Sequence, residues 1–212
     1  MTRNSWRGLQ IISVVGLAWS VAAQGAVIYD NGGPDQVYGT QMSEFQVAED
    51  FTIGSAANID NIRFWSIQEF LADYTGSVFW AIYSDAPGEP AALVQGGVTA
   101  AVAATATGNS TGFGYAEYVF DIPVTFTLSA GNYWLGLHNG SLATTTPTEM
   151  LWSTTATPVG SAGLYLDTGS WIDSGNEHAF RLDGTVVPIP TAVWLFGSAL
   201  GLIGVTRRKL TA

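Results

Sequence analysis

Residues 76–84, Gly-Ser-Val-Phe-Trp-Ala-Ile-Tyr-Ser, are the stretch of the chain that most clearly indicates its fold class. In an extended chain, successive side chains point to opposite faces. Both faces of this stretch would then be apolar, with Val78, Trp80 and Ile82 on one and Phe79, Ala81 and Tyr83 on the other. Such a strand is covered on two sides, so we expect it in the middle of a sheet.

Strand signals continue on both sides of this stretch, through most of residues 26–187. They recur at 58–67, 115–121, 124–128, 132–138, 150–153, 164–167 and 179–182, and turns rich in Gly, Pro, Asn and Asp separate them. Helical periodicity is nearly absent, and only residues 67–74 could form one helical turn. The pattern predicts an all-β protein: an antiparallel β-sandwich or jelly roll of about 10–12 strands.

Residues 90–114 carry no charge and consist mainly of Ala, Thr, Val and Gly. Their threonines and glycines make them too polar to span a membrane. We expect a pair of strands here, joined by a mobile tip at residues 107–112.

The charge of the chain is unevenly distributed. Residues 26–187 contain all seventeen carboxylates but only two arginines, which gives them a net charge of −15. This excludes nucleic acid as a partner, because phosphates need clustered cations. The charge also favours solubility and opposes self-association. Cysteine is absent, which excludes a thiol nucleophile, disulfide bonds and cysteine-ligated metals.

Residues 1–25 have the order of a secretory signal peptide. Arg3 and Arg7 precede an apolar run at 9–21, and the small residues Ala23 and Gly25 follow it. We expect signal peptidase to cut after Gly25, with cleavage after Ala23 as the alternative.

Residues 186–212 have the pattern of a membrane segment that is preceded by two prolines. Residues 191–206 are almost entirely apolar, which predicts a short transmembrane helix. The positive-inside rule places its basic end (Arg207, Arg208 and Lys209) in the cytoplasm. Proline cannot donate the hydrogen bonds of a helix interior, so Val187, Pro188, Ile189 and Pro190 lie just outside the helix. The body of the protein is then residues 26–185.

The tail VPIPTAVWLFGSALGLIGVTRRK resembles the PEP-CTERM sorting signal of Gram-negative bacteria, in its Val-Pro-x-Pro variant. The glutamate of the Pro-Glu-Pro motif is replaced here by Ile189. The resemblance implies processing by an exosortase near residues 187–190, after transient residence in the inner membrane. It also implies a host that makes exopolysaccharide and a mature protein at the cell surface or in the matrix.

The body is similar to a β-sandwich domain that recurs in exported bacterial proteins with interchangeable anchors. The matching stretches are VAEDFT at 47–52, IRFW at 62–65, AIYS at 81–84, GNYWLGL at 131–137 and AFRLDG at 179–184. This second resemblance implies the fold and adds little about function.

Titratable residues give weak signals for chemistry. The two histidines, His138 and His178, are too few for a zinc site and are expected to be structural, with His138 exposed at a strand end. Asp167 and Asp173 lie in an oxygen-rich stretch that is a candidate for a structural calcium ion, although Asx turns explain such residues equally well. No other cofactor is expected. Glu44, Glu49, Asp50 and Glu117 are candidate carboxylates for glycoside hydrolysis by residue type alone.

Tryptophans raise the possibility of sugar binding, because aromatic faces stack on pyranose rings. We expect Trp80 and Trp134 in the core. Trp152 at a strand end and Trp171 in a polar stretch are the candidates for exposed carbohydrate contacts.

Together these features predict an exported, non-enzymatic surface or matrix protein associated with exopolysaccharide. Two alternatives remain open: a secreted hydrolase acting on polysaccharide, and a purely structural coat component without a ligand.

Overall fold

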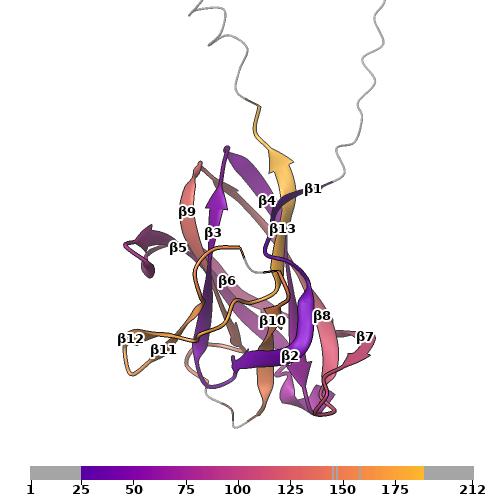
Figure 1. Ribbon diagram of the computed structural model, residues 1–212. Helices are drawn as coiled ribbons and strands as arrows, with labels where there is room; N and C mark the ends of the chain where they lie inside the picture. The colour runs from indigo at the N-terminus through magenta and orange to yellow at the C-terminus, as the bar shows by residue number, and fades with distance from the viewer. Residues whose placement is uncertain (1–24, 145, 147, 158, 189–212) are drawn as a thin grey trace, which may run out of the picture.

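The computed structural model describes residues 25–144, 146, 148–157 and 159–188, which form two antiparallel β-sheets (Figure 1). The two sheets contribute to one shared apolar core, an arrangement consistent with a β-sandwich. The all-β prediction is therefore confirmed. One 3₁₀ turn, η1 (Leu71–Asp73), lies within the residues that were expected to supply a helical turn.

The first sheet has seven strands and is organised around β4, which pairs with β13, β10 and β8. Along one side the order is β1 (Ala26–Asp30), β13 (Phe180–Val186), β4 (Ala57–Gln68), β10 (Met150–Thr155) and β2 (Pro34–Gln41). On the other side of β4 lie β8 (Ala116–Leu128) and then β7 (Thr105–Ser110).

The second sheet has six strands. Their order is β12 (Ser170–Asp173), β11 (Leu164–Asp167), β3 (Gln46–Ile53), β9 (Gly131–Asn139), β5 (Ser77–Ala86) and β6 (Glu89–Ala100). Strand β5 contains most of the 76–84 stretch and is paired on both sides, which confirms its predicted position inside a sheet.

Aromatic side chains from both sheets fill the core. Phe64 of β4 stacks on Phe120 of β8 with ring centroids 4.8 Å apart. Trp80 of β5 stacks across the sandwich on Phe126 at 5.4 Å. Trp134 is buried in a smaller cluster with Ala48 and Leu164. The expectation that Trp80 and Trp134 are core residues is confirmed.

The strand count of 10–12 was too low, because the described residues contain thirteen strands. The stretch from Asp167 to Asp173 is not an open loop. It is the end of β11, a two-residue turn and β12, and the turn residues Thr168 and Gly169 both have positive φ, as this hairpin geometry requires.

Residues 90–114 also differ from the prediction of a joined strand pair. Strand β6 pairs with β5 in one sheet, whereas β7 pairs with β8 in the other. Part of the predicted mobile tip belongs to β7. The segment therefore crosses from one sheet to the other. The alternation of apolar and polar residues along one stretch does not indicate which sheet a strand joins.

Both ends of the described chain leave from the same end of the body (Figure 1). Ala26 of β1 pairs with Gly184 of β13, and the amide of Val187 still donates to the carbonyl of Ala56. The predicted cleavage residue Ala23 and, in the tail, Ile189, Pro190, Arg207, Arg208 and Lys209 lie outside the described residues, as does the expected helix at 191–206. Within the described part, no helix is long and apolar enough to cross a bilayer.

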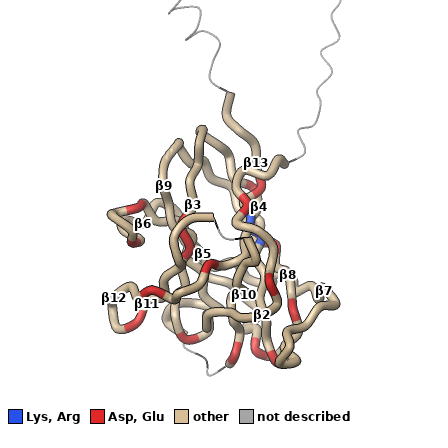
Figure 2. Tube along the Cα trace, in the orientation of Figure 1, with Lys and Arg blue, Asp and Glu red and all other residues tan. Residues whose placement is uncertain are grey.

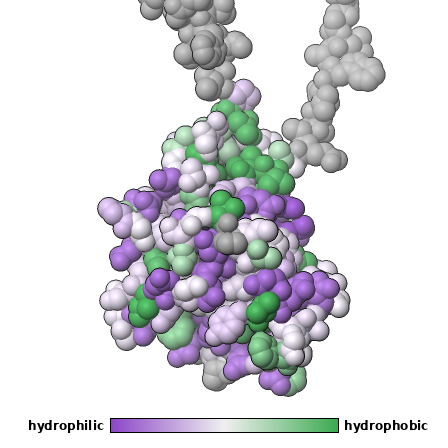
Figure 3. All heavy atoms as spheres, viewed as in Figure 1, coloured by the Kyte–Doolittle hydropathy of each residue, from purple (hydrophilic) through white to green (hydrophobic). Residues whose placement is uncertain are grey.

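Charge and hydropathy are distributed differently over the surface. Figure 2 shows carboxylates spread over the body, whereas the two described arginines, Arg63 of β4 and Arg181 of β13, are register partners on neighbouring strands. Hydrophobic residues gather at the end where β13 finishes and are otherwise scattered among polar ones in this view (Figure 3).

Candidate functional site

Two adjoining pockets flank β2 and form one groove, to which both contribute Tyr38, Gly39 and Leu151. The larger pocket has a volume of about 420 Å³ and the smaller about 290 Å³. The larger is also lined by Thr40, Gln41, Phe45, Tyr165, Asp167, Ser174 and Asn176. The smaller is also lined by Val37, Ile67, Phe113 and Tyr115.

Gly39, which lines both pockets, allows the close approach of β2 to β10. A Cβ atom at this position would lie 2.8 Å from Leu151 Cβ and 2.8 Å from the carbonyl oxygen of Trp152. Neither atom is the free end of a flexible side chain. The neighbouring Tyr38 is 58% exposed and lines both pockets.

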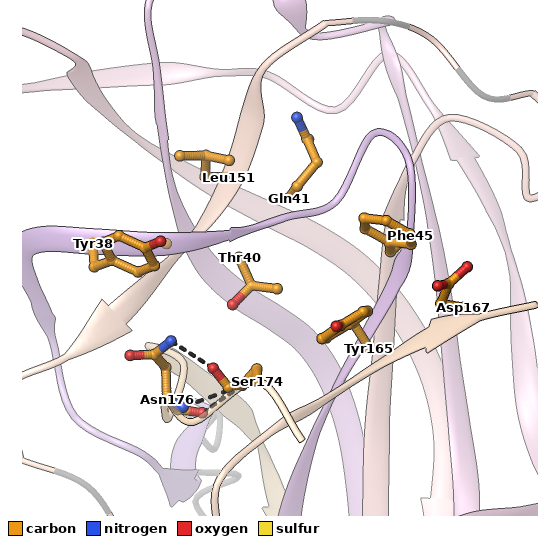
Figure 4. Close-up of a pocket in the computed structure, with 10 residues that line it drawn as sticks. Tyr38, Thr40, Gln41, Phe45, Leu151, Tyr165, Asp167, Ser174 and Asn176 are labelled. Atoms are coloured by element: carbon orange, nitrogen blue, oxygen red, sulfur yellow. Dashed lines mark hydrogen bonds between the residues drawn. The ribbon is translucent and has the colours of Figure 1, made fainter. Parts of the chain in front are cut away.

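The larger pocket combines aromatic rings with amide and hydroxyl groups (Figure 4). Tyr38 and Tyr165 come from different sheets, and Asn176 lies below Thr40 in this view. The Asn176 amide is held by a hydrogen bond of 2.9 Å to the Ser174 carbonyl oxygen. Rings that offer flat apolar faces, beside fixed polar groups, suit a ligand with both CH surfaces and hydroxyl groups.

A buried polar chain continues behind Thr40. Its hydroxyl oxygen lies 2.8 Å from Nε2 of His178, and Nδ1 of His178 lies 2.5 Å from Oε2 of Glu49. The main-chain N–H of His178 donates to the same carboxyl oxygen at 2.8 Å. The side chains of Glu49 and His178 are fully buried, and the ring of Trp152 packs on the imidazole at 5.0 Å.

Burial keeps this pair neutral. Desolvation raises the pKa of Glu49 well above its ordinary value, and it lowers the pKa of His178 to about 3. Oε1 of Glu49 has no hydrogen-bond partner among the described residues, an arrangement that a neutral carboxyl group tolerates far better than a charged one. The two side chains therefore share one proton over a wide pH range.

The order hydroxyl, imidazole, carboxyl is also that of a nucleophile relay. Two properties of this chain argue against that role. The imidazole is fully buried, so a leaving group has no access to its proton, and a pKa of about 3 makes it a weak general base near neutrality. The pair instead fixes the orientation of the Thr40 hydroxyl at the wall of the groove.

The two tryptophans predicted to contact carbohydrate differ in their burial. Trp152 is fully buried, and its indole N–H donates to the carbonyl of Ala179 at 2.9 Å, so the prediction that it is exposed is wrong. Its strand, β10, is paired on both sides by β2 and β4, which covers what looked like a strand end. Trp171 is partly buried against Tyr83, at a ring distance of 6.3 Å, and lines neither pocket.

The two calcium candidates lie at opposite ends of the β11–β12 hairpin. Asp167 lines the larger pocket, and Asp173 accepts a hydrogen bond of 2.7 Å from the amide of Gly175, as in an Asx turn. In the described ranges no group of three or more His, Asp or Glu side chains is placed to hold a metal ion.

The prediction that His138 is exposed is wrong. It is 2% exposed because β9 lies between β3 and β5 and extends one residue past it.

The four candidate carboxylates do not share a cleft. Glu44 is exposed, Glu49 belongs to the buried pair, and Asp50 lines a different small pocket of about 220 Å³. Glu117 is 2% exposed and accepts hydrogen bonds from Thr107 and Asn109. Asp167 is the one carboxylate among the described residues that line the groove.

Sequence reasoning missed Thr40, Tyr38 and Tyr165 as site residues. One signal for the buried pair was present in the sequence. Glu49 lies between Val47 and Phe51 on the face of β3 that points into the core. A carboxylate in a core-facing row needs a buried partner, and this could have directed attention to a histidine.

The chain matches no known family, and no curated protein is detectably similar to it.

The proton shared by Glu49 and His178 contributes to the pH dependence of stability. The raised pKa of Glu49 stabilises the fold fully below about pH 4.5, and this contribution is lost as the pH rises. The lowered pKa of His178 stabilises the fold fully above about pH 6.5, and this contribution is lost as the pH falls toward 3. Between these limits the two slopes cancel, so the pair favours folding most at mildly acidic pH.

Glu49→Gln removes the carboxyl contribution and keeps an acceptor oxygen for the His178 amide. Relative to the wild type, the free energy of unfolding of Glu49→Gln should rise by more than ~1 kcal/mol between about pH 5 and pH 8. Urea denaturation across this range measures the difference. The exposed Glu44→Gln is the control and should show no such trend. If the free energy of unfolding of the wild type instead increased relative to that of Glu49→Gln as the pH rose, Glu49 would be ionised in the fold.

Proposed function

We propose that this is an exported, non-enzymatic surface or matrix protein that binds a neutral exopolysaccharide in the groove around Tyr38. Sorting by an exosortase through its C-terminal signal is part of the proposal. The groove is the observation that carries it.

The composition of the groove supports a sugar ligand. Tyr38, Phe45 and Tyr165 line the larger pocket beside two amides and the Thr40 hydroxyl, and Phe113 and Tyr115 continue the aromatic lining into the smaller pocket. Two adjoining pockets that share Tyr38, Gly39 and Leu151 offer room for more than one sugar unit.

The charges support a neutral polymer rather than an acidic one. Both described cations are already paired, Arg63 with Asp121 at 2.7 Å and Arg181 with Asp183 at 2.9 Å. Asp167 adds a negative group to the groove itself. A uronate or sulfated polymer would meet the Asp167 carboxylate there, with no free cation from the described part of the chain.

The position of the groove suits a protein tethered by its tail. Strand β4 pairs with Val186 through Ala57, whereas Ile67, ten residues further along, lines the groove. At the rise of a strand this separation is about 33 Å. A ligand in the groove would therefore be held away from the membrane while the tail is still anchored.

The hydrolase alternative lacks one requirement in this groove. Glycoside hydrolysis uses two carboxyl groups flanking the bond, and Asp167 has no second carboxylate beside it among the described lining residues.

Tyr38→Ala tests the groove, and Phe70→Ala is its matched control. Tyr38 and Phe70 are aromatic and almost equally exposed, at 58% and 60%, but Phe70 lines neither pocket. In affinity electrophoresis and calorimetry with neutral glucans, galactans and mannans, Tyr38→Ala should weaken binding about tenfold, or ~1.4 kcal/mol. Phe70→Ala should bind as the wild type does.

Polygalacturonate in the same assays should bind at least tenfold more weakly than the best neutral polymer. No binding to any neutral polymer, or equal losses from Tyr38→Ala and Phe70→Ala, would contradict the groove as a sugar site. The purely structural coat component would then be the better account.

Intact mass of the protein from its native host tests the sorting half of the proposal. We expect loss of about 25 residues at each end, with most of the protein in the extracellular fraction. A complete C-terminus recovered from the inner membrane would contradict processing, and the protein would then be a membrane-anchored domain.

A further inference from the structure

Strand β6 is an open edge of the six-stranded sheet. It pairs with β5 on one side, and on its other side residues 91–100 make no backbone hydrogen bond to any described residue. Unpaired N–H and C=O groups along an edge form a template for another strand.

Neither face of β6 is covered by another layer. Leu93, Val94 and Val98 are 62%, 45% and 52% exposed, although their side chains alternate between the two faces of the strand. Exposed apolar side chains along an open edge gain burial when a neighbouring strand brings its own side chains beside them.

The usual protections of an edge are confined to the first part of β6, which begins with Glu89 and Pro90, and are missing from Gln95 to Ala100. Residues 90–116 contain no charged residue, and the only proline in β6, Pro90, is at its beginning. Bulges opposite Tyr83 bend the first part of the strand. From Gln95 to Ala100, however, the register with β5 is uninterrupted, so the edge there is regular.

The distribution of charge makes this edge the place where two copies of the chain repel each other least. A net charge of −15 makes copies repel wherever their carboxylates face each other, and residues 90–116 are a long stretch without one. Each copy also presents the same open strand. Antiparallel pairing about a two-fold axis would satisfy both edges at once, which is how isologous dimers close.

We propose that β6 of one molecule pairs antiparallel with β6 of a second copy, so that the six-stranded sheets of the two molecules become one continuous sheet. The dimer would place two grooves in one particle and bind a polysaccharide chain at two points. The pairing itself does not depend on sugar binding. Its affinity should increase with salt, because screening weakens the repulsion between the bodies.

Sedimentation equilibrium of the host-processed protein tests the pairing, with the double variant Leu93→Lys/Val98→Lys. The matched control is Val27→Lys/Val159→Lys, which changes two valines of similar exposure, 53% and 52%, outside β6. We expect a wild-type dimer whose Kd falls as salt is raised. The β6 variant should raise the Kd at least tenfold, although its added cations reduce the overall repulsion, and the control should not raise it.

Cysteine cross-linking gives an independent readout, because the chain has no cysteine of its own. Val98→Cys should give a covalent dimer with a short bismaleimide linker, and Val27→Cys should not. A monomer at all concentrations and salt levels would overturn the proposal, as would a dimer that survives the β6 lysines. Pairing of β6 with a strand of another protein, without self-association, would also overturn it. None of these results depends on glycan binding.

Discussion

The neutral Glu49–His178 pair, buried between the two sheets, is the interaction on which the rest of the structure depends. Glu49 belongs to β3 in one sheet, and His178 lies two residues before the start of β13 in the other. Thr40 and Trp152 bring β2 and β10 to the same imidazole, and the Asn31 amide donates to the His178 carbonyl at 2.9 Å. Removing either partner would leave a buried polar group unpaired, a loss of several kcal/mol.

The groove is a consequence of this packing. His178 holds Thr40, Gly39 lets β2 lie close to β10, and Tyr38 is left on the surface between two pockets. The Thr40 side of the site is thus supported by the core of the sandwich, whereas Phe45, Phe113, Ser174 and Asn176 come from the segments between strands. The Gln41 and Asn176 amides are held by hydrogen bonds, which suits a binding role because these side chains have less conformational freedom to lose when a ligand binds.

Local pattern was sufficient for the fold class, because alternation of apolar residues at 76–84 depends only on strand geometry. It was not sufficient for the site. Trp152 was expected on the surface, since the four-residue signal around it does not reveal that β2 and β4 pair on both sides. The groove joins Tyr38 to Tyr165, which are 127 positions apart, and contacts at such separation are set by sheet topology. His138 was misjudged for the same reason, because the position of β9 between two strands is a long-range property.

Chemical-shift mapping of a neutral oligosaccharide titrated into the isotope-labelled, host-processed protein tests the central claim most directly. The account predicts that the amides of Tyr38, Gly39, Thr40 and Tyr165 shift together, with no shift of the Trp171 indole. Shifts centred on Trp171 that leave the groove unchanged would contradict it, since the sugar would then bind on a different surface of the sandwich.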